Sequence, residues 1–121
     1  MDKLQIDVLN CRKICNLLKA LSHPTRMTIV VKLLEGNGKK CVNDIGDMIN
    51  LPQPNISQHL FILKANGIVD WVQQGKKRCY FLKKPWLIKN ILKMGKNFLE
   101  KTEKYGNRKQ KRQNQENFKT N

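Results

Sequence analysis

The sequence predicts a mainly α-helical fold of about five helices with one small two-stranded β-hairpin. Apolar residues recur every three or four positions over most of the first hundred residues, which is the spacing of helix faces. Between residues 69 and 82, two short strands flank a basic, glycine-containing tip. With 121 residues and 40% hydrophobic content, the chain suits one small domain with a thin core rather than an enzyme with a large cleft.

The first two helices follow from apolar spacing and from turn residues. Leu4 to Leu21 is predicted to be helical because one apolar stripe runs along it, formed by Leu4, Val8, Cys11, Cys15 and Leu18. A second helix is expected over Arg26–Leu34, with Ser22 as its cap and Pro24 in its first turn. Its β-branched run has poor helix propensity, so burial must hold it in place.

The next two helices are short and joined by a tight turn. The third is expected over Lys40–Ile49, followed by the turn Asn50-Leu-Pro52. The fourth spans about Gln53 to Ala65 and ends in a left-handed cap at Asn66-Gly67. Its core residues are predicted to be Ile56, Leu60 and Leu63.

A hairpin and a last helix complete the predicted fold. Strands are expected over Val69–Gln73 and Arg78–Leu82, and Pro85-Trp86 opens a helix with Leu87, Ile88, Ile91, Leu92, Phe98 and Leu99 on its apolar face. An amphipathic helix followed by a basic hairpin indicates a winged helix-turn-helix. We expect one domain over residues 1–102 and a basic, disordered tail over residues 103–121.

The polar face of the fourth helix and the hairpin tip predict a surface for double-stranded DNA. Amide, hydroxyl and imidazole groups hydrogen-bond base edges and phosphates, and basic side chains attract the backbone. A net charge of +15 favours the same polyanionic partner, although lysine used as a solubilising residue would explain part of it. The predicted contacts are Gln53, Asn55, Ser57, Gln58, His59, Lys64, Lys76, Lys77 and Arg78.

The predicted location is the cytoplasm. No apolar run is long enough to cross a bilayer, and the first residues lack the basic and apolar segments of a signal peptide. In that compartment four cysteines serve more often as thiols, metal ligands or redox sensors than as structural disulfides.

Three motifs in combination resemble the ArsR/SmtB family of bacterial repressors over about residues 15–100. They are Leu-Ser-His-Pro-Thr-Arg, Pro-Gln-Pro-Asn-Ile-Ser-Gln-His-Leu-Phe-Ile-Leu, and Gly-Lys-Lys-Arg-Cys-Tyr-Phe-Leu. The resemblance implies a homodimer built from the first and last helices, and repression relieved by a metal ion, a metalloid or an oxidant. A symmetric dimer of this kind binds a pseudo-palindromic operator. No enzymatic activity is expected.

The cysteines predict a soft-metal or metalloid site. Cys11 and Cys15 lie one helical turn apart on the same face, where two thiolates can hold one soft ion. Cys41 matches the first thiolate of the family's Cys-Val-Cys motif, but Asn43 stands where the second would be. By the resemblance, Cys11, Cys15 and Cys41 would bind As(III), Sb(III), Pb(II) or Cd(II). A family site of Asp, His and Glu on the last helix is excluded, since that helix has no Asp or His.

Other interpretations remain open at this point. Cys11 and Cys15 pack equally well as small apolar residues of a dimer core. Cys79 is interpreted as structural because no partner thiol is close in sequence, and His23 is interpreted as a turn and capping residue.

Three other functions remain open. A winged-helix regulator without a metal site would respond to thiol oxidation, to a protein partner or to its own abundance. A nonspecific architectural DNA binder would show a steep salt dependence without a preferred sequence. A thiol oxidoreductase is disfavoured, because Cys11-x-x-x-Cys15 lies within a helix.

Overall fold

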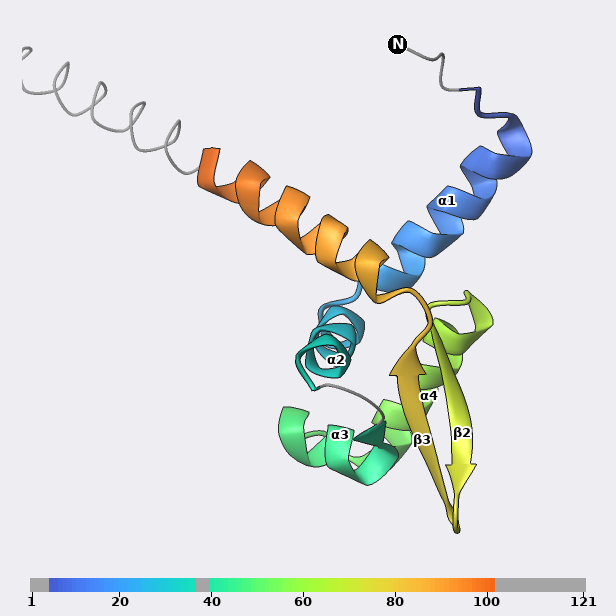
Figure 1. Cartoon of the computed structure of the whole chain (residues 1–121), viewed down its shortest axis with the longest axis vertical. Coiled ribbons are helices and arrows are strands. Elements are labelled where there is room, and N and C mark those ends of the chain that lie inside the picture. The colour runs from blue at the N-terminus through green and yellow to red at the C-terminus, as the bar shows by residue number, and fades with distance from the viewer. Residues whose placement is uncertain (1–4, 37–39, 102–121) are drawn as a thin grey trace, which may run out of the picture. The chain divides into compact units, whose positions relative to one another are not determined.

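The computed structural model describes residues 5–36 and 40–101, which contain five helices and one three-stranded antiparallel sheet (Figure 1). The chain divides into two compact units, Met1–Pro85 and Trp86–Asn121. The first unit holds α1 to α4 and all three strands, and the second holds most of a C-terminal helix over residues 85–101. Among the described residues, no helix is long and apolar enough to span a membrane.

Helix α1 covers Val8–Leu21, a later start than the sequence predicted. Asp7 sets that start, because its carboxylate accepts a hydrogen bond from the backbone N–H of Asn10 at 2.7 Å. Ser22 does not cap the second helix as expected. Its hydroxyl instead donates to the carbonyl of Lys19 at 2.8 Å, so that it closes the end of α1.

Helix α2 covers Pro24–Glu35 and is capped by His23, as the sequence predicted for that histidine. The backbone N–H of Thr25 donates to His23 Nδ1 at 3.1 Å, and Pro24 occupies the first turn. Arg26 ties α2 to the end of α1, since its Nε donates to the carbonyl of Ala20 at 2.6 Å. The buried side chains of Ile29 and Val30 offset the low helix propensity of the β-branched run.

Helices α3 (Val42–Ile49) and α4 (Gln53–Ala65) form the helix-turn-helix. Asn50 turns the chain between them with a left-handed backbone, φ 59° and ψ 49°. Glycine at position 46 also leaves room for the turn, because a Cβ there would lie in tight contact with the carbonyl oxygen of Leu51, at 3.1 Å. The predicted start of α3 at Lys40 was wrong, since the two residues before Val42 form a strand.

One face of α4 is buried, as predicted. Ile56, Leu60 and Leu63 have no solvent exposure, and they anchor the helix in the core of the first unit. Gly67, with φ +73°, ends the helix, and the backbone N–H of Ile68 then donates to the carbonyl of Leu63 at 3.0 Å. Asn66 is not left-handed, so the predicted cap rests on the glycine.

The sheet has the strand order β1-β3-β2. Strands β2 (Val69–Gln74) and β3 (Lys77–Leu82) form the predicted hairpin, each one residue longer at the turn than expected. Gly75, with φ +62°, occupies the first position of the two-residue turn, where a left-handed backbone suits the twist of the hairpin. Strand β1 (Lys40–Cys41) pairs with β3 and appears in Figure 1 as the short arrow beside it.

The C-terminal helix is described over residues 85–101 and exposes several large apolar side chains, among them Trp86, Met94 and Leu99. The predicted tail over residues 103–121 lies outside the described residues.

Replacing Gly67 by alanine should destabilise the protein by about 1–2 kcal/mol, the cost of a left-handed backbone for a residue with a Cβ. No atom lies within 4 Å of the added Cβ, so a clash does not contribute. Gly95→Ala is the matched control, because it fills equally open space within a helix and should stabilise by up to about 1 kcal/mol. Urea denaturation of both variants measures the difference, and equal effects would contradict the role given to Gly67.

Candidate nucleic-acid interface

The exposed start of α4 carries the amide and hydroxyl groups predicted to contact DNA. Gln53, Asn55, Ser57 and Gln58 are all exposed, because they lie opposite the buried stripe of the helix. No side chain caps the first turn, whose N-cap residue is Pro52. The positive end of the helix dipole therefore faces outward beside these polar groups, which favours a phosphate nearby.

A hollow of about 680 Å³ lies where this helix meets the hairpin. It brings together six of the predicted DNA contacts, three from α4 and three from the hairpin, and adds six residues that were not predicted to contact DNA. The lining residues are Cys41, Val42, Asn43, Gln53, Ser57, Phe61, Lys64, Trp71, Lys76, Lys77, Arg78 and Tyr80. Asn55, Gln58 and His59 are not among them.

The hollow is positively charged. Lys64, Lys76, Lys77 and Arg78 line it, and no carboxylate is among the described residues that do so. Lys64 lies 3.8 Å from Asp70, but both side chains are more than two-fifths exposed, so this ion pair is weak. The hollow therefore suits a polyanion rather than a cationic or apolar ligand.

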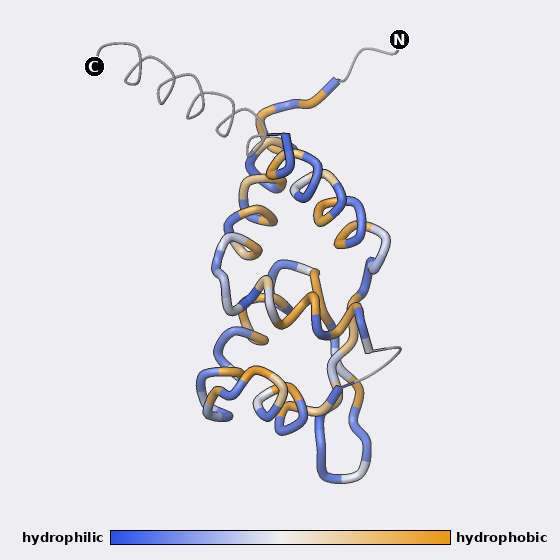
Figure 2. The backbone as a smooth tube through the Cα atoms, turned by 90° about the vertical axis from the view of Figure 1, so that its left-hand side faces the viewer, coloured by the Kyte–Doolittle hydropathy of each residue, from blue (hydrophilic) through white to orange (hydrophobic). Residues whose placement is uncertain are grey.

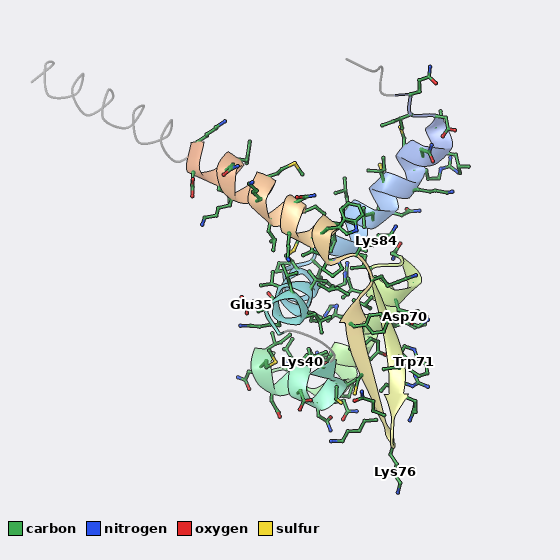
Figure 3. All side chains as sticks on the ribbon, in the orientation of Figure 1. Glu35, Lys40, Asp70, Trp71, Lys76 and Lys84 are labelled. Carbon is green, nitrogen blue, oxygen red and sulfur yellow. The ribbon has the colours of Figure 1, made fainter. Side chains whose placement is uncertain are left out.

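Trp71 fixes the position of Arg78. The guanidinium carbon of Arg78 lies 4.4 Å from the ring centroid of Trp71, a cation–π contact between neighbouring strands. Figure 3 labels Trp71 on β2, where it pairs in register with the buried Tyr80. The sequence predicted that Arg78 contacts DNA, but it did not predict that Trp71 belongs to the same site. Strand alternation alone does not show which side chains contact each other.

Phe61 is a second lining residue that the sequence interpretation missed. Its side chain is 73% exposed, although it lies between the buried residues of the same helix. A large aromatic group outside the predicted core stripe could have revealed it, because such a residue has no packing reason to be there. Apolar contacts of this kind recognise the methyl group of thymine.

The hairpin tip extends the basic surface. Figure 3 shows Lys76 at the end of the hairpin, and Figure 2 shows that the tip is hydrophilic. The Gln73 side chain donates to the carbonyl of Gly75 at 3.0 Å, which steadies the turn. The positive charge of Lys76 is therefore carried by a turn whose backbone is held by a hydrogen bond.

His59 occupies a different environment from the other polar residues of α4. Its ring lies against that of His23, with 4.6 Å between the centroids, and its Nδ1 is buried with no hydrogen-bond partner among the described residues. Burial lowers the pKa of His59, and the positive charges of His23 and Arg26 lower it further. The phosphate contact predicted for His59 stays a prediction.

The cysteines occupy separate places. Cys11 and Cys15 are exposed on α1, and Cys41 is half-buried at the edge of the hollow. Across residues 5–36 and 40–101, no three His, Cys, Asp or Glu side chains are grouped closely enough to hold a metal ion. Cys79 is buried, and its register partner on β1 is Cys41. No thiol is close to Cys79 in the sequence, as predicted, but strand pairing places Cys41 opposite it.

A helix-turn-helix followed by a basic β-hairpin, with polar groups at the start of its second helix, defines a winged helix-turn-helix regulator. The profile of the bacterial regulatory proteins of the arsR family matches residues 23–70. The fold is similar to the crystal structure of the transcriptional repressor BigR from Xylella fastidiosa, with a TM-score of 0.60. The two chains are 33% identical in sequence over the matched part, which covers 69% of this chain and 87% of that one. The chain belongs to the ArsR/SmtB family.

Two further relatives are transcriptional regulators by name. The HTH-type transcriptional repressor SmtB of Mycobacterium tuberculosis is 44% identical over 66 residues, which is 54% of this chain and 47% of that protein. The cadmium resistance transcriptional regulatory protein CadC of Listeria innocua is 37% identical over 82 residues, which is 68% of this chain and 67% of that protein. The chain thus spans about half the length of the mycobacterial relative.

The environment of His59 predicts a loss of stability in acid. The lowered pKa means that the unfolded chain binds a proton more readily than the folded chain. The stabilisation is therefore complete above the ordinary histidine pKa of about 6.5 and is lost as the pH falls through the lower, folded value. Thermal unfolding between about pH 8 and pH 5 should show this decline in the wild type and a smaller one in His59→Gln.

His23→Asn serves as the control for this measurement. Asparagine still caps α2, and burial is the largest cause of the shift at His59, so most of the pH dependence should persist. A profile unchanged in His59→Gln would contradict the assignment.

Proposed function

We propose that this chain is a transcriptional repressor that binds a pseudo-palindromic DNA operator as a homodimer in the cytoplasm. The observation that carries the proposal is the hollow in which the polar start of α4 meets the basic hairpin. Family membership supports it, since SmtB and BigR are both named as repressors.

In this proposal α4 enters the major groove. Gln53 and Asn55 pair with adenine, because an amide side chain can donate to and accept from that base at once. Ser57 and Gln58 contact neighbouring base edges or phosphates, and His59 contacts phosphate. Lys64, Lys76, Lys77 and Arg78 bind the backbone, and the stacking on Trp71 holds the guanidinium of Arg78 in place.

The proposed dimer buries apolar side chains that one chain leaves exposed. On α1 these include Val8, Leu9 and Leu18, and on the C-terminal helix Met94 and Leu99. Figure 2 shows hydrophobic and hydrophilic residues alternating along α1, as in an amphipathic helix. Exposed apolar groups of this number on two helices suit a protein interface. Two-fold symmetry would place the two α4 helices in successive major grooves, about 34–36 Å apart.

The Asn55→Ala variant should bind the operator about 5- to 150-fold more weakly, which corresponds to the loss of one bidentate base contact of about 1–3 kcal/mol. Binding to unrelated DNA should not change, because the lost contact is to a base. Fluorescence anisotropy with a labelled promoter fragment measures both affinities. An equal loss on both DNAs would contradict base recognition by Asn55.

The Arg78→Ala variant should instead weaken binding to operator and unrelated DNA alike. Because one phosphate contact is lost, the slope of log affinity against log salt should become shallower by about one unit. Lys13→Ala is the matched control, since it removes one exposed positive charge from α1, outside the hollow. A similar change in the control would show that net charge, and not the position of Arg78, controls affinity.

For the inducer we propose a soft ion of the As(III), Sb(III), Pb(II) or Cd(II) type, held by thiolates of Cys11, Cys15 and Cys41. The support is the exposure of the two α1 thiols, one turn apart, and the name of the cadmium resistance regulator CadC. Because the described residues of one chain do not group three such ligands, the site would be completed across the dimer. The ion must bind the DNA-free form more tightly to release the operator.

Arsenite should release the reduced protein from its operator at about one ion per subunit. Cys41→Ser should bind DNA as the wild type does but no longer respond, because serine offers no thiolate. The same anisotropy titration measures both properties. A variant that still responds to arsenite would exclude Cys41 from the site, without affecting the assignment of the DNA surface.

A further inference from the structure

Two cysteines face each other across the short β1–β3 ladder. Cys41 on β1 is the direct register partner of Cys79 on β3, next to the pair formed by Lys40 and Tyr80. Residues directly opposite each other in antiparallel strands project from the same face, with their Cβ atoms about 4.5–5.5 Å apart. Their Cα atoms are about 4.5 or 5.5 Å apart, and both values lie within the range of disulfides, about 4.4–6.8 Å.

We propose that Cys41 and Cys79 are a thiol pair that a hydroperoxide converts to an intrachain disulfide between β1 and the wing strand β3. The two thiols lie far apart in the sequence, so that only strand pairing brings them together. The proposal concerns a modification of the chain, and it does not depend on the identity of the operator or of the inducer.

The two thiols differ in access, which sets the order of the reaction. Cys41 is half-buried and lines the hollow, whereas the side chain of Cys79 is 1% exposed. A small oxidant therefore reaches Cys41 first, because it is the more exposed of the two residues. The buried Cys79 thiol then reacts with the oxidised sulfur of Cys41 to form the disulfide.

The reaction balances with hydrogen peroxide as the oxidant. The Cys41 sulfur attacks the O–O bond and takes one oxygen, giving a sulfenic acid and releasing the other oxygen as water. The Cys79 sulfur then attacks the Cys41 sulfur, the S–O bond breaks, and the hydroxyl leaves as a second water. Two thiols have lost two protons and two electrons, and the peroxide has been reduced to two water molecules.

The surroundings of both residues are compatible with this bond. The Cys79 Sγ lies 3.3 Å from the side-chain oxygen of Gln74, an exposed residue at the end of β2. Cys41 is the N-cap residue of α3, but its side chain makes no capping hydrogen bond, so that oxidation costs the helix no cap. The disulfide would attach the start of α3 directly to the wing, through a ladder that is only two residues long.

Cys11 and Cys15 provide an internal comparison. Both are exposed, but Cβ atoms one helical turn apart are separated by about 5–6 Å, whereas those of directly opposed strand residues are about 4.5–5.5 Å apart and so lie nearer to the approximately 3.8 Å typical of a disulfide. Exposure alone would favour oxidation of this pair, whereas geometry favours Cys41 and Cys79. The identity of the disulfide that forms therefore shows whether exposure or geometry decides which thiols are oxidised.

The experiment uses the full chain, reduced with dithiothreitol, freed of it and treated with hydrogen peroxide. Remaining thiols are blocked with N-ethylmaleimide, and the disulfide is mapped by proteolysis and mass spectrometry. The wild type and the Cys11→Ser/Cys15→Ser double variant should both form a Cys41–Cys79 link within one chain, with the loss of two hydrogen atoms. Oxidation should also raise the midpoint of thermal unfolding, because the link constrains the unfolded chain.

Two variants and three outcomes make the test decisive. Cys41→Ser and Cys79→Ala should each abolish both the link and the gain in thermal stability. Full alkylation of both thiols after peroxide, a Cys41 oxidised further without a link, or a bond between two chains would overturn the proposal. If Cys79→Ala fails to fold, mapping of the double variant still decides the question, since it retains only the two proposed partners. The readouts are the disulfide link and the thermal stability of the chain, and none of them involves DNA, so failure here is distinct from failure to bind DNA.

Discussion

The burial of one face of α4 is the constraint on which the rest of the structure depends. Ile56, Leu60 and Leu63 have no exposure, and their spacing fixes the rotation of the helix about its axis. The amide and hydroxyl groups at the start of α4 must then face outward. The same rotation turns Phe61 and Lys64 toward the hairpin, so that a single packing requirement creates one wall of the hollow.

Periodicity in the sequence was sufficient to predict the helices and the hairpin, because apolar residues recur along each of them at helix or strand spacing. It could not predict β1, whose two residues are too few to show alternation and were absorbed into the neighbouring helix. Ser22 was assigned to the wrong helix for a related reason, since a serine between two helices can close one or open the other.

The sequence was sufficient to predict those parts of the candidate site that depend on the chemistry of individual side chains. It was not sufficient to predict the parts that depend on contacts between two side chains. The amides of α4 and the basic hairpin tip were evident from residue type and position. The cation–π contact of Arg78 with Trp71, the tilted ring contact of His59 with His23 and the pairing of Cys41 with Cys79 all join residues that are distant in sequence or on different elements. Each needs the register of the sheet or the packing of α4 on α2, which residue type does not specify.

The position of Trp71 also makes the protein its own optical reporter. Its indole lines the hollow, lies under a guanidinium, and is only half-buried, so that its emission depends on what occupies that space. The second tryptophan, Trp86, is exposed on the C-terminal helix, and replacing it by phenylalanine would leave one emitter. Quenching or spectral shift in that single-tryptophan chain would follow occupation of the hollow in real time, without any label on the nucleic acid.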